Sequence, residues 1–172
     1  MAVYKRYADN IVSMAFMDQE ARKNPKISIS ELKKIDNAST RALKQIVSKI
    51  GWPTISKVGK EASQKAWLLL QHTNDIKFVG RCLNMMKKHI NDIDKTSIPY
   101  LVDKINLTRG KNQYYGTIMS SKVINNKIVI ITPKLRNKKS VNTRRRQFGL
   151  EPLEDQIKRN EKVFRKYFLN RK

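Results

Sequence analysis

The sequence contains a single cysteine, Cys82, and two histidines among its 172 residues. One cysteine excludes an internal disulfide framework and agrees with a reducing compartment, so we expect a cytoplasmic protein, or one inside a host cell if the source is viral. Cysteine and histidine are too few for a zinc site of the Cys/His type, and we predict no metal and no cofactor. No apolar run approaches the roughly 18 residues that span a bilayer, so no membrane partner is expected.

Proline, glycine and acidic residues are also scarce. Five prolines and six glycines, with 40% hydrophobic and 30% charged residues, exclude a collagen-like or wholly disordered chain. Only 14 acidic residues face 37 basic ones, which gives a net charge of +23. Residues 1–100 hold 18 basic and 9 acidic side chains, and residues 101–172 hold 19 and 5. This charge favours an anionic partner, either a small ligand or a nucleic acid.

The apolar spacing of the first hundred residues is helical. It predicts helices over about 7–22, 29–50, 60–71, 75–91 and 99–107. The second has clear limits, because Ser28 followed by Glu31 forms a capping box, and Gly51 with Pro53 ends the helix.

The pattern changes after residue 110. Residues 113–119 and 123–132 are rich in β-branched residues and tyrosine, and Asn125-Asn126 between them predicts a two-residue hairpin turn. A last helix is predicted from about residue 152 to 169. We therefore predict an α+β fold, a mainly α-helical single domain over residues 1–155 with a small antiparallel β-hairpin in its C-terminal half. The basic helix within residues 152–172 packs on this domain or extends from it.

A histidine stands at the end of an apolar helix. If that helix continued past Gln71 and His72, then His72 and Asp75 would share a face. The carboxylate would then orient the imidazole and raise its basicity, as a general base requires. In the alternative interpretation Asp75 caps the next helix and His72 simply ends its own.

Three alternating positions carry polar groups after Arg109-Gly110-Lys111, a segment without the glycine spacing of a phosphate loop. On a strand, Gln113, Tyr115 and Thr117 would point to one face, which meets solvent or lines a pocket. The Gly51-Trp52-Pro53-Thr54 turn offers a similar choice, because Trp52 packs in the core or forms a pocket wall.

Residues 133–146 contain seven basic side chains and no acidic one. Arg144 and Arg145 are candidates for holding a phosphate or carboxylate, because a guanidinium group binds these anions through two parallel hydrogen bonds. The remaining basic side chains of the segment are candidates for contacting the phosphates of a nucleic acid. They are Lys134, Arg136, Lys138, Lys139 and Arg146.

Six short motifs follow one another along the chain. They are GWPT (51–54), Val-Gly (58–59), Leu-Leu-Gln-His (69–72), Tyr-Leu-x-Asp (100–103), Gln-x-Tyr-Gly-Thr (113–117), and Arg-Arg-x-x-x-Gly-Leu with Pro-Leu (144–153). In this order they resemble an uncharacterised bacterial domain-of-unknown-function family, over about residues 10–155. The resemblance implies one polar and aromatic set gathered in one pocket: Trp52, Gln71, His72, Asp103, Gln113, Tyr115, Thr117, Arg144 and Arg145.

Two functions fit these observations. The first is a soluble, pocket-forming domain that binds a small anionic ligand, such as a nucleotide or another phosphate-bearing molecule. As a hydrolase or transferase it would use His72 as the base, with Gln71 and Tyr115 beside it, and the other residues of the set would bind the ligand. The alternative is a basic module that binds nucleic-acid phosphates without catalysis. The residues alone do not decide whether the protein is an enzyme.

Overall fold

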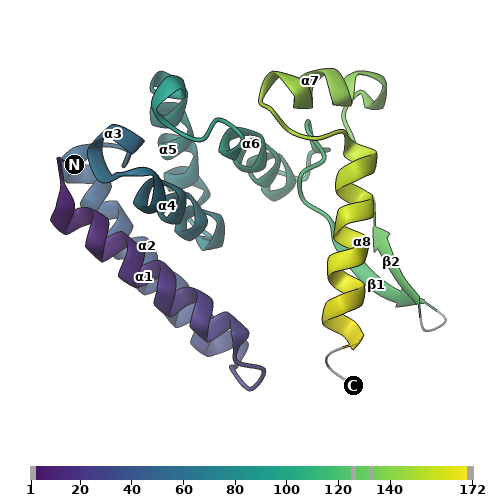
Figure 1. Cartoon of the computed structure of the whole chain (residues 1–172), viewed down its shortest axis with the longest axis horizontal. Coiled ribbons are helices and arrows are strands. Elements are labelled where there is room, and N and C mark those ends of the chain that lie inside the picture. The colour runs from purple at the N-terminus through teal and green to yellow at the C-terminus, as the bar shows by residue number, and fades with distance from the viewer. Residues whose placement is uncertain (1–2, 125–126, 132–133, 170–172) are drawn as a thin grey trace. The chain divides into compact units, whose positions relative to one another are not determined.

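A computed structural model describes residues 3–124, 127–131 and 134–169 of the chain (Figure 1). The chain forms two compact units, which meet in the sequence between Lys95 and Thr96. The first unit is helical in its described residues, and the second combines helices with one β-hairpin. The predicted fold class, mainly α-helical with a small antiparallel hairpin in the C-terminal half, is confirmed.

The first unit is built around three packed helices. Its elements are α1 (Lys5–Lys23), α2 (Ile29–Ile50), α3 (Ile55–Val58), α4 (Lys60–His72), α5 (Ile76–Lys88) and the 3₁₀ turn η1 (Ile90–Asp92). The helices α1 and α2 run side by side, joined by a short loop, and α4 contacts both of them (Figure 1). Polar side chains at the ends of these helices therefore lie close to one another.

The limits of α2 follow the predicted signals. The Ser28 side chain accepts a hydrogen bond from the Glu31 N–H at 3.1 Å, and the Glu31 carboxylate accepts one from the Ser28 N–H at 2.8 Å. Gly51 ends the helix at a φ of 70°, a conformation that glycine adopts without steric cost. Both local predictions are confirmed.

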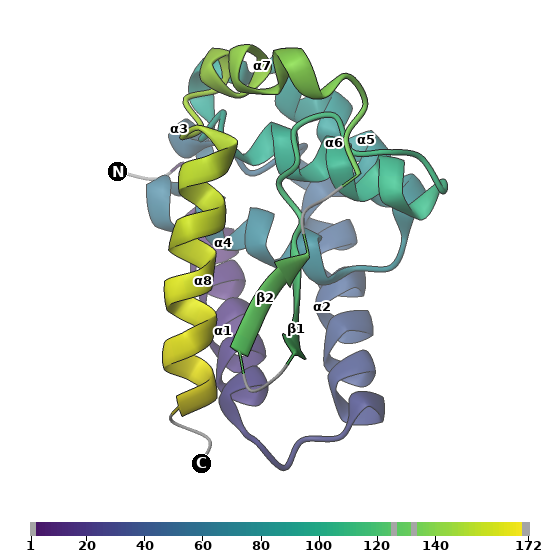
Figure 2. The same cartoon turned by 90° about the vertical axis from the view of Figure 1, so that its right-hand side faces the viewer.

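The second unit places one helix along a hairpin. Its elements are α6 (Ser97–Thr108), β1 (Ser120–Ile124), β2 (Lys127–Ile131), the 3₁₀ turn η2 (Lys138–Ser140), α7 (Val141–Gln147) and α8 (Leu153–Leu169). The strands pair antiparallel, from Ser120 with Ile131 to Ile124 with Lys127. The C-terminal helix α8 packs along β2 (Figure 2). Among the described residues, no helix is both long and apolar enough to cross a bilayer.

The prediction of a strand over residues 113–119 is wrong. Only Gln113 forms an isolated bridge, with Leu135, and β1 begins at Ser120. The segment stays a loop because buried side chains, rather than a neighbouring strand, bond to its N–H and C=O groups. The predicted alternation of Gln113, Tyr115 and Thr117 on one strand face therefore does not apply. The predicted turn at 125–126 and the strand end at 132 lie outside the described residues.

Candidate functional site

The first unit contains a fully buried carboxylate in the C-terminal part of α1. Asp18 follows Ala8, Ile11 and Ala15 on the buried stripe of α1 and has an exposed fraction of 0%. A buried charge is costly unless it is paired and hydrogen-bonded. Asp18 receives hydrogen bonds from Gln19 at 2.8 Å and from Arg22, one turn further along the helix.

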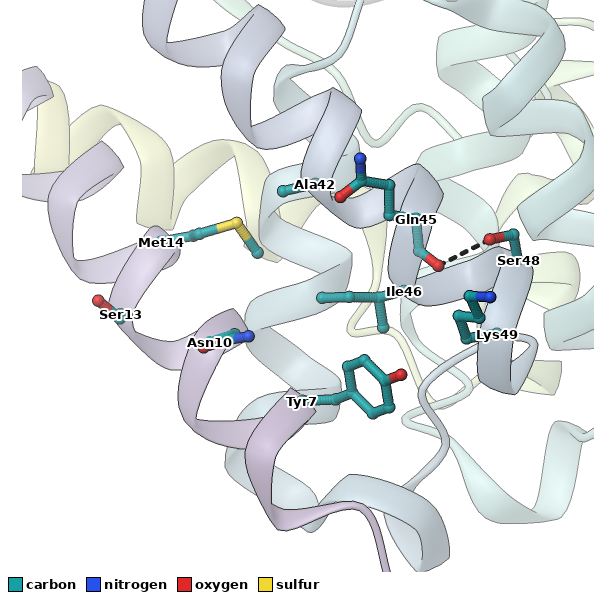
Figure 3. A pocket seen from close by; sticks show the side chains of 9 residues that line it. All are labelled: Tyr7, Asn10, Ser13, Met14, Ala42, Gln45, Ile46, Ser48 and Lys49. Carbon is teal, nitrogen blue, oxygen red and sulfur yellow. Dashed lines mark hydrogen bonds between the residues drawn. The ribbon is translucent and has the colours of Figure 1, made fainter.

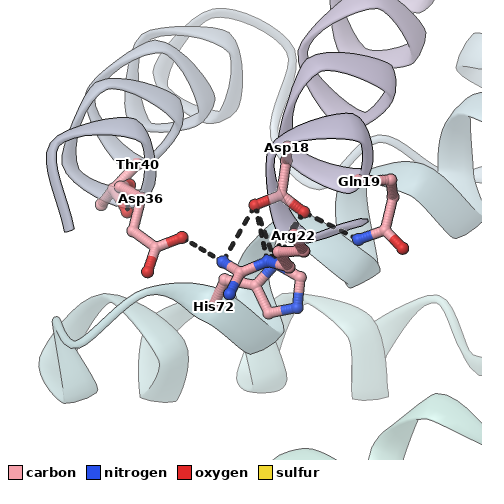
Figure 4. Close-up of polar contacts among 6 residues, drawn as sticks. All are labelled: Asp18, Gln19, Arg22, Asp36, Thr40 and His72. Atoms are coloured by element: carbon pink, nitrogen blue, oxygen red, sulfur yellow. Dashed lines mark hydrogen bonds and ion pairs between the residues drawn. The ribbon is translucent and has the colours of Figure 1, made fainter. Parts of the chain in front are cut away.

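Arg22 joins Asp18 to a second carboxylate. Its Nε lies 3.1 Å from Asp18 Oδ1, and its Nη2 lies 3.0 Å from the same oxygen. The same Nη2 also donates to Asp36 on α2. Because a guanidinium presents its donors in a rigid fork, this arrangement fixes the two helices and the orientation of the Asp18 carboxylate together (Figure 4).

His72 completes the cluster from the last turn of α4. Its Nδ1 lies 3.1 Å from Asp18 Oδ1 and 3.0 Å from Oδ2 (Figure 4). An ionised carboxylate can only accept, so Nδ1 carries the hydrogen of the neutral imidazole and Nε2 keeps its lone pair. The described residues supply no hydrogen-bond partner for Nε2. The side chain is 22% exposed, so this nitrogen belongs to a ring that solvent reaches.

The electrostatics of the cluster favour a neutral imidazole. Burial lowers the pKa of His72 below its ordinary value of 6.5, and Arg22 acts in the same direction against the raising effect of Asp18 and Asp36. Burial alone would raise the pKa of Asp18, but the hydrogen bonds from Arg22 and Gln19 outweigh it and hold that pKa below its ordinary value. At neutral pH an ionised Asp18 therefore faces an uncharged base.

Three of these groups are also potential metal ligands. Ligand atoms of Asp18, Asp36 and His72 lie within 4.8 Å of one another. However, the Arg22 guanidinium already bonds to both carboxylates, and a metal ion would have to displace it. The donor set therefore fits proton transfer better than metal coordination, and the absence of a metal stays a prediction.

The sequence pattern predicts His72 as a candidate base but pairs it with Asp75, whereas in the structure its carboxylate partner is Asp18 on α1. Asp75 instead caps α5, accepting from the Phe78 N–H at 2.9 Å, and pairs with Lys44 at 2.6 Å. The alternative interpretation of Asp75 as a cap is confirmed. One sequence signal would have identified Asp18, because it stands on the apolar stripe of α1, four residues before Arg22.

The other predicted residues of the first unit are Trp52 and Gln71. Trp52 is buried in the turn after α2, and its indole N–H has no hydrogen-bond acceptor among the described residues. This burial agrees with the interpretation that Trp52 packs in the core. Gln71 precedes His72 in the last turn of α4 and is half-buried.

The six predicted residues of the second unit gather around the loop 113–119. Asp103, fully buried on α6, accepts hydrogen bonds from the N–H groups of Tyr114 at 2.6 Å and Thr117 at 2.9 Å, and from the Thr117 hydroxyl at 2.9 Å. Gln113 bonds both the N–H and the C=O of Ile118. Burial raises the pKa of Tyr115, whose ring stands edge-on to its neighbours Tyr114 and Phe148. These contacts make the loop rigid.

The two candidate anion-binding arginines bond to protein oxygens. Arg144 donates to the carbonyls of Tyr114, Arg136 and Asn137 and to the Ser140 hydroxyl. Arg145, with an exposed fraction of 0%, donates to the carbonyls of Tyr115 and Glu151 and to the Gln156 amide oxygen. An anion would have to compete with these oxygens. That the nine residues of the set share one pocket therefore stays a prediction.

The predicted nucleic-acid contacts differ from these arginines in exposure. The side chains of all five are exposed, and no ion pair with a described carboxylate involves them. They are Lys134, Arg136, Lys138, Lys139 and Arg146. Their charges are available to an external anion.

A groove between α1 and α2 is the largest of the described cavities, with a volume of about 640 Å³ (Figure 3). Met14 and Ile46 point into it, and Tyr7, Asn10 and Lys49 stand at its border (Figure 3). Its lining contains no carboxylate and no imidazole, and its titratable side chains are Tyr7 and Lys49. His72 does not line this groove.

The fold and the cluster define a mainly α-helical protein with a partly buried Asp–Arg–Asp–His cluster at the junction of three helices. A family model described as "Family of unknown function (DUF6624)" matches residues 5–167, and the chain belongs to this family. No curated protein and no solved structure matches the chain.

Proposed function

We propose that the protein is an acid–base enzyme, a hydrolase or transferase, that uses His72 as its general base on a small anionic, phosphate-bearing substrate such as a nucleotide. One observation carries this proposal: the 3.0 Å contact between His72 Nδ1 and the buried carboxylate of Asp18. That contact leaves Nε2 with a lone pair on a partly exposed ring.

The proposed proton path runs through the imidazole. Nε2 removes the proton from a water molecule or a substrate hydroxyl, and the oxygen attacks the phosphoryl or acyl centre of the substrate. The imidazolium that forms is stabilised by Asp18, which Arg22 holds in place. Nε2 then returns the proton to the leaving group. The lowered pKa of His72 supports this role, because the base must be unprotonated at the start.

The anionic substrate is supported by the charge of the chain. The net charge of +23 attracts anions over long distances and raises their encounter rate. With a neutral imidazole, the charges of Asp18, Arg22 and Asp36 sum to −1, so the cluster stabilises the proton that His72 accepts but does not attract the phosphate. Surface lysines and arginines supply the positive charge.

The test is a search for turnover with a matched pair of variants. The purified protein is incubated with nucleoside mono-, di- and triphosphates and with nitrophenyl mono- and diesters of phosphate. We expect His72→Asn, whose amide still donates to Asp18, to lower turnover by about 10²–10⁴-fold. His89→Asn, at an exposed position, is the control and keeps full activity. Turnover that survives His72→Asn would contradict the proposal.

A second function, binding of nucleic-acid phosphates by the second unit, is supported by the exposed side chains of Lys134, Arg136, Lys138, Lys139 and Arg146. Each phosphate contact lowers the slope of log K against log salt by about 0.9 for a duplex. Titrations with duplex and single-stranded oligonucleotides at two salt concentrations test it. Binding that does not weaken with salt would remove this function.

We also propose that the GWPT, QH and QxYGT motifs are signatures of the family, that the chain is bacterial, and that it acts in the cytoplasm. The single cysteine, Cys82, has no disulfide partner within the chain, which agrees with that location.

A further inference from the structure

A cavity in the second unit combines two positive charges with an apolar floor. Its volume is about 490 Å³, within the usual range for small-molecule sites. Lys111, Asn112, Ser120 and Lys134 contribute polar groups to its lining. The apolar part of the lining consists of Leu107, Ile118, Met119 and Ile131.

The walls of this cavity are held by the main chain. The Lys111 N–H bonds to the Asn106 carbonyl at 2.8 Å, after Gly110 reverses the chain at a φ of 68°. The Lys134 carbonyl accepts from the Gln113 N–H at 2.9 Å. The Gln113 side chain in turn bonds the N–H and C=O of Ile118 at 3.0 and 2.7 Å. The backbone at Lys111, Lys134 and Ile118 is therefore held by hydrogen bonds without a ligand.

The charge of the cavity is not balanced within it. No lining residue is a carboxylate, and neither lysine pairs with a described carboxylate. Both lysines are exposed, whereas Arg144 and Arg145 are buried and bond to protein oxygens. In this cavity the second unit therefore presents the ammonium groups of its two lysines to a ligand, rather than the guanidinium groups of Arg144 and Arg145.

The apolar side chains of the cavity favour a ligand that has an apolar part. Leu107 is 42% exposed and Ile131 is 43% exposed, so their apolar surface still faces solvent. Covering apolar surface contributes about 25 cal/mol per Å² to binding. A ring or another flat apolar group would cover these side chains, and a nearby dianion would match two ammonium groups.

We propose that this cavity binds a phosphomonoester with an apolar, ring-containing body, its phosphate held by Lys111 and Lys134. Near neutral pH a phosphomonoester carries close to two negative charges, because its second pKa is about 6. The same chemistry occurs in a free mononucleotide and in the 5′-phosphate end of a nucleic acid. The proposal does not depend on His72.

Calorimetric titration with phenyl phosphate, phenol and inorganic phosphate tests the combination of charge and ring. We expect phenyl phosphate to bind saturably at one site, and phenol and inorganic phosphate each to bind about tenfold more weakly. Leu107→Ser, at a half-exposed position, weakens binding of phenyl phosphate but not of inorganic phosphate. Phenyl phosphate binding no tighter than inorganic phosphate would overturn the proposal.

Lysine variants test the location. The double variant Lys111→Ala with Lys134→Ala is expected to lower the phenyl phosphate affinity about tenfold or more. Lys122→Ala is the matched control, because Lys122 is exposed on β1 and does not line the cavity, and it changes the affinity within about twofold. An equal loss in the control would show a net-charge effect and overturn the proposal. All of these titrations are run in His72→Asn protein, so that binding at this cavity is measured without turnover by the proposed base.

Two oligonucleotides distinguish the sources of the phosphate. A short single strand is compared with and without a 5′-phosphate, in the unchanged protein and in the double lysine variant. A preference for the phosphorylated strand that the double variant loses identifies a nucleic-acid end as a ligand of this cavity. Equal binding of both strands, together with saturable phenyl phosphate binding, identifies a free phosphomonoester.

Discussion

Each unit of the protein buries one carboxylate completely, but the two carboxylates have different partners. Asp103 in the second unit bonds mainly to the main chain of the loop 113–119. Asp18 in the first unit bonds to side chains that carry charge or titrate, Arg22 and His72. A carboxylate that accepts hydrogen bonds from main-chain N–H groups holds a loop in place, whereas one that bonds to a histidine orients the imidazole and shifts its pKa. The partner, rather than burial, is what separates the proposed active site from a structural carboxylate.

The largest expected effect concerns the structural carboxylate. Asp103→Ala leaves the N–H groups of Tyr115 and Thr117 buried without an acceptor, and frees that of Tyr114. Each buried unpaired donor costs about 1–3 kcal/mol, so the free energy of unfolding should fall by about 2–6 kcal/mol. Urea denaturation followed by circular dichroism measures it. A decrease below about 1 kcal/mol would contradict the assigned role of Asp103.

Asp18, the carboxylate of the proposed active site, should matter less for stability. Asp18→Asn removes the charge that Arg22 and His72 face, and breaking a buried pair costs about 3–5 kcal/mol. Arg22 keeps Asp36 as a partner and is 28% exposed, so solvent screens part of its interaction with Asp18. We therefore expect the free energy of unfolding to fall by only about 2 kcal/mol. The same urea titration, run beside Asp103→Ala, gives the ranking. Turnover should fall as it does in His72→Asn, because the imidazole loses its orienting partner.

The pH dependence of stability sharpens the comparison from the histidine side. Burial holds the pKa of His72 in the folded chain below 6.5, its ordinary value in the unfolded chain. At pH values between the folded and the unfolded pKa, the unfolded chain therefore binds more protons than the folded one. Stability is therefore complete above about pH 6.5 and decreases as the pH falls below it, by at most about 1.4 kcal/mol per pH unit. Denaturation midpoints at about pH 7.5 and 5.5, on either side of the ordinary histidine pKa, measure this slope. His72→Asn should flatten it, and a slope that His72→Asn leaves unchanged would show that this histidine is not its source.

The smallest effect is expected at the exposed basic side chains of the second unit. Lys138→Ala with Lys139→Ala should change the free energy of unfolding by no more than about 0.5 kcal/mol, because both side chains are exposed and form no ion pair with a described carboxylate. The same double variant should reduce the salt dependence of oligonucleotide binding by about 0.9 for each phosphate that these two lysines neutralise. A large decrease in stability would show that these lysines have a structural role.

Local signals in the sequence are sufficient to predict most of the helices. The capping box at Ser28 and Glu31 and the stop at Gly51 act within a few residues, and a single sequence contains them completely. Composition also predicts the hairpin, but it places the first strand at residues 113–119, entirely before β1. Residues 113–119 have strand-like composition, yet Asp103, Arg144 and Arg145 compete for their main-chain groups from positions distant in sequence.

The candidate site is only half predictable for the same reason. His72 can be singled out in the sequence because it is one of two histidines and ends an apolar helix. Asp18 lies 54 residues away, and only the packing of α1 against α4 brings it to the imidazole. Arg144 and Arg145 suit an anion because a guanidinium bonds well to phosphate, but it also bonds well to carbonyl oxygens, and the sequence does not distinguish these partners.

The most direct test of the central claim is the tautomer and pKa of His72, measured by proton–nitrogen correlation NMR of the imidazole rings during a pH titration. The arrangement around Asp18 requires hydrogen on Nδ1, an unprotonated Nε2 at neutral pH, and a pKa below the ordinary 6.5. Hydrogen on Nε2 of the neutral ring, or a pKa above 6.5, would contradict the account of His72 as a poised base.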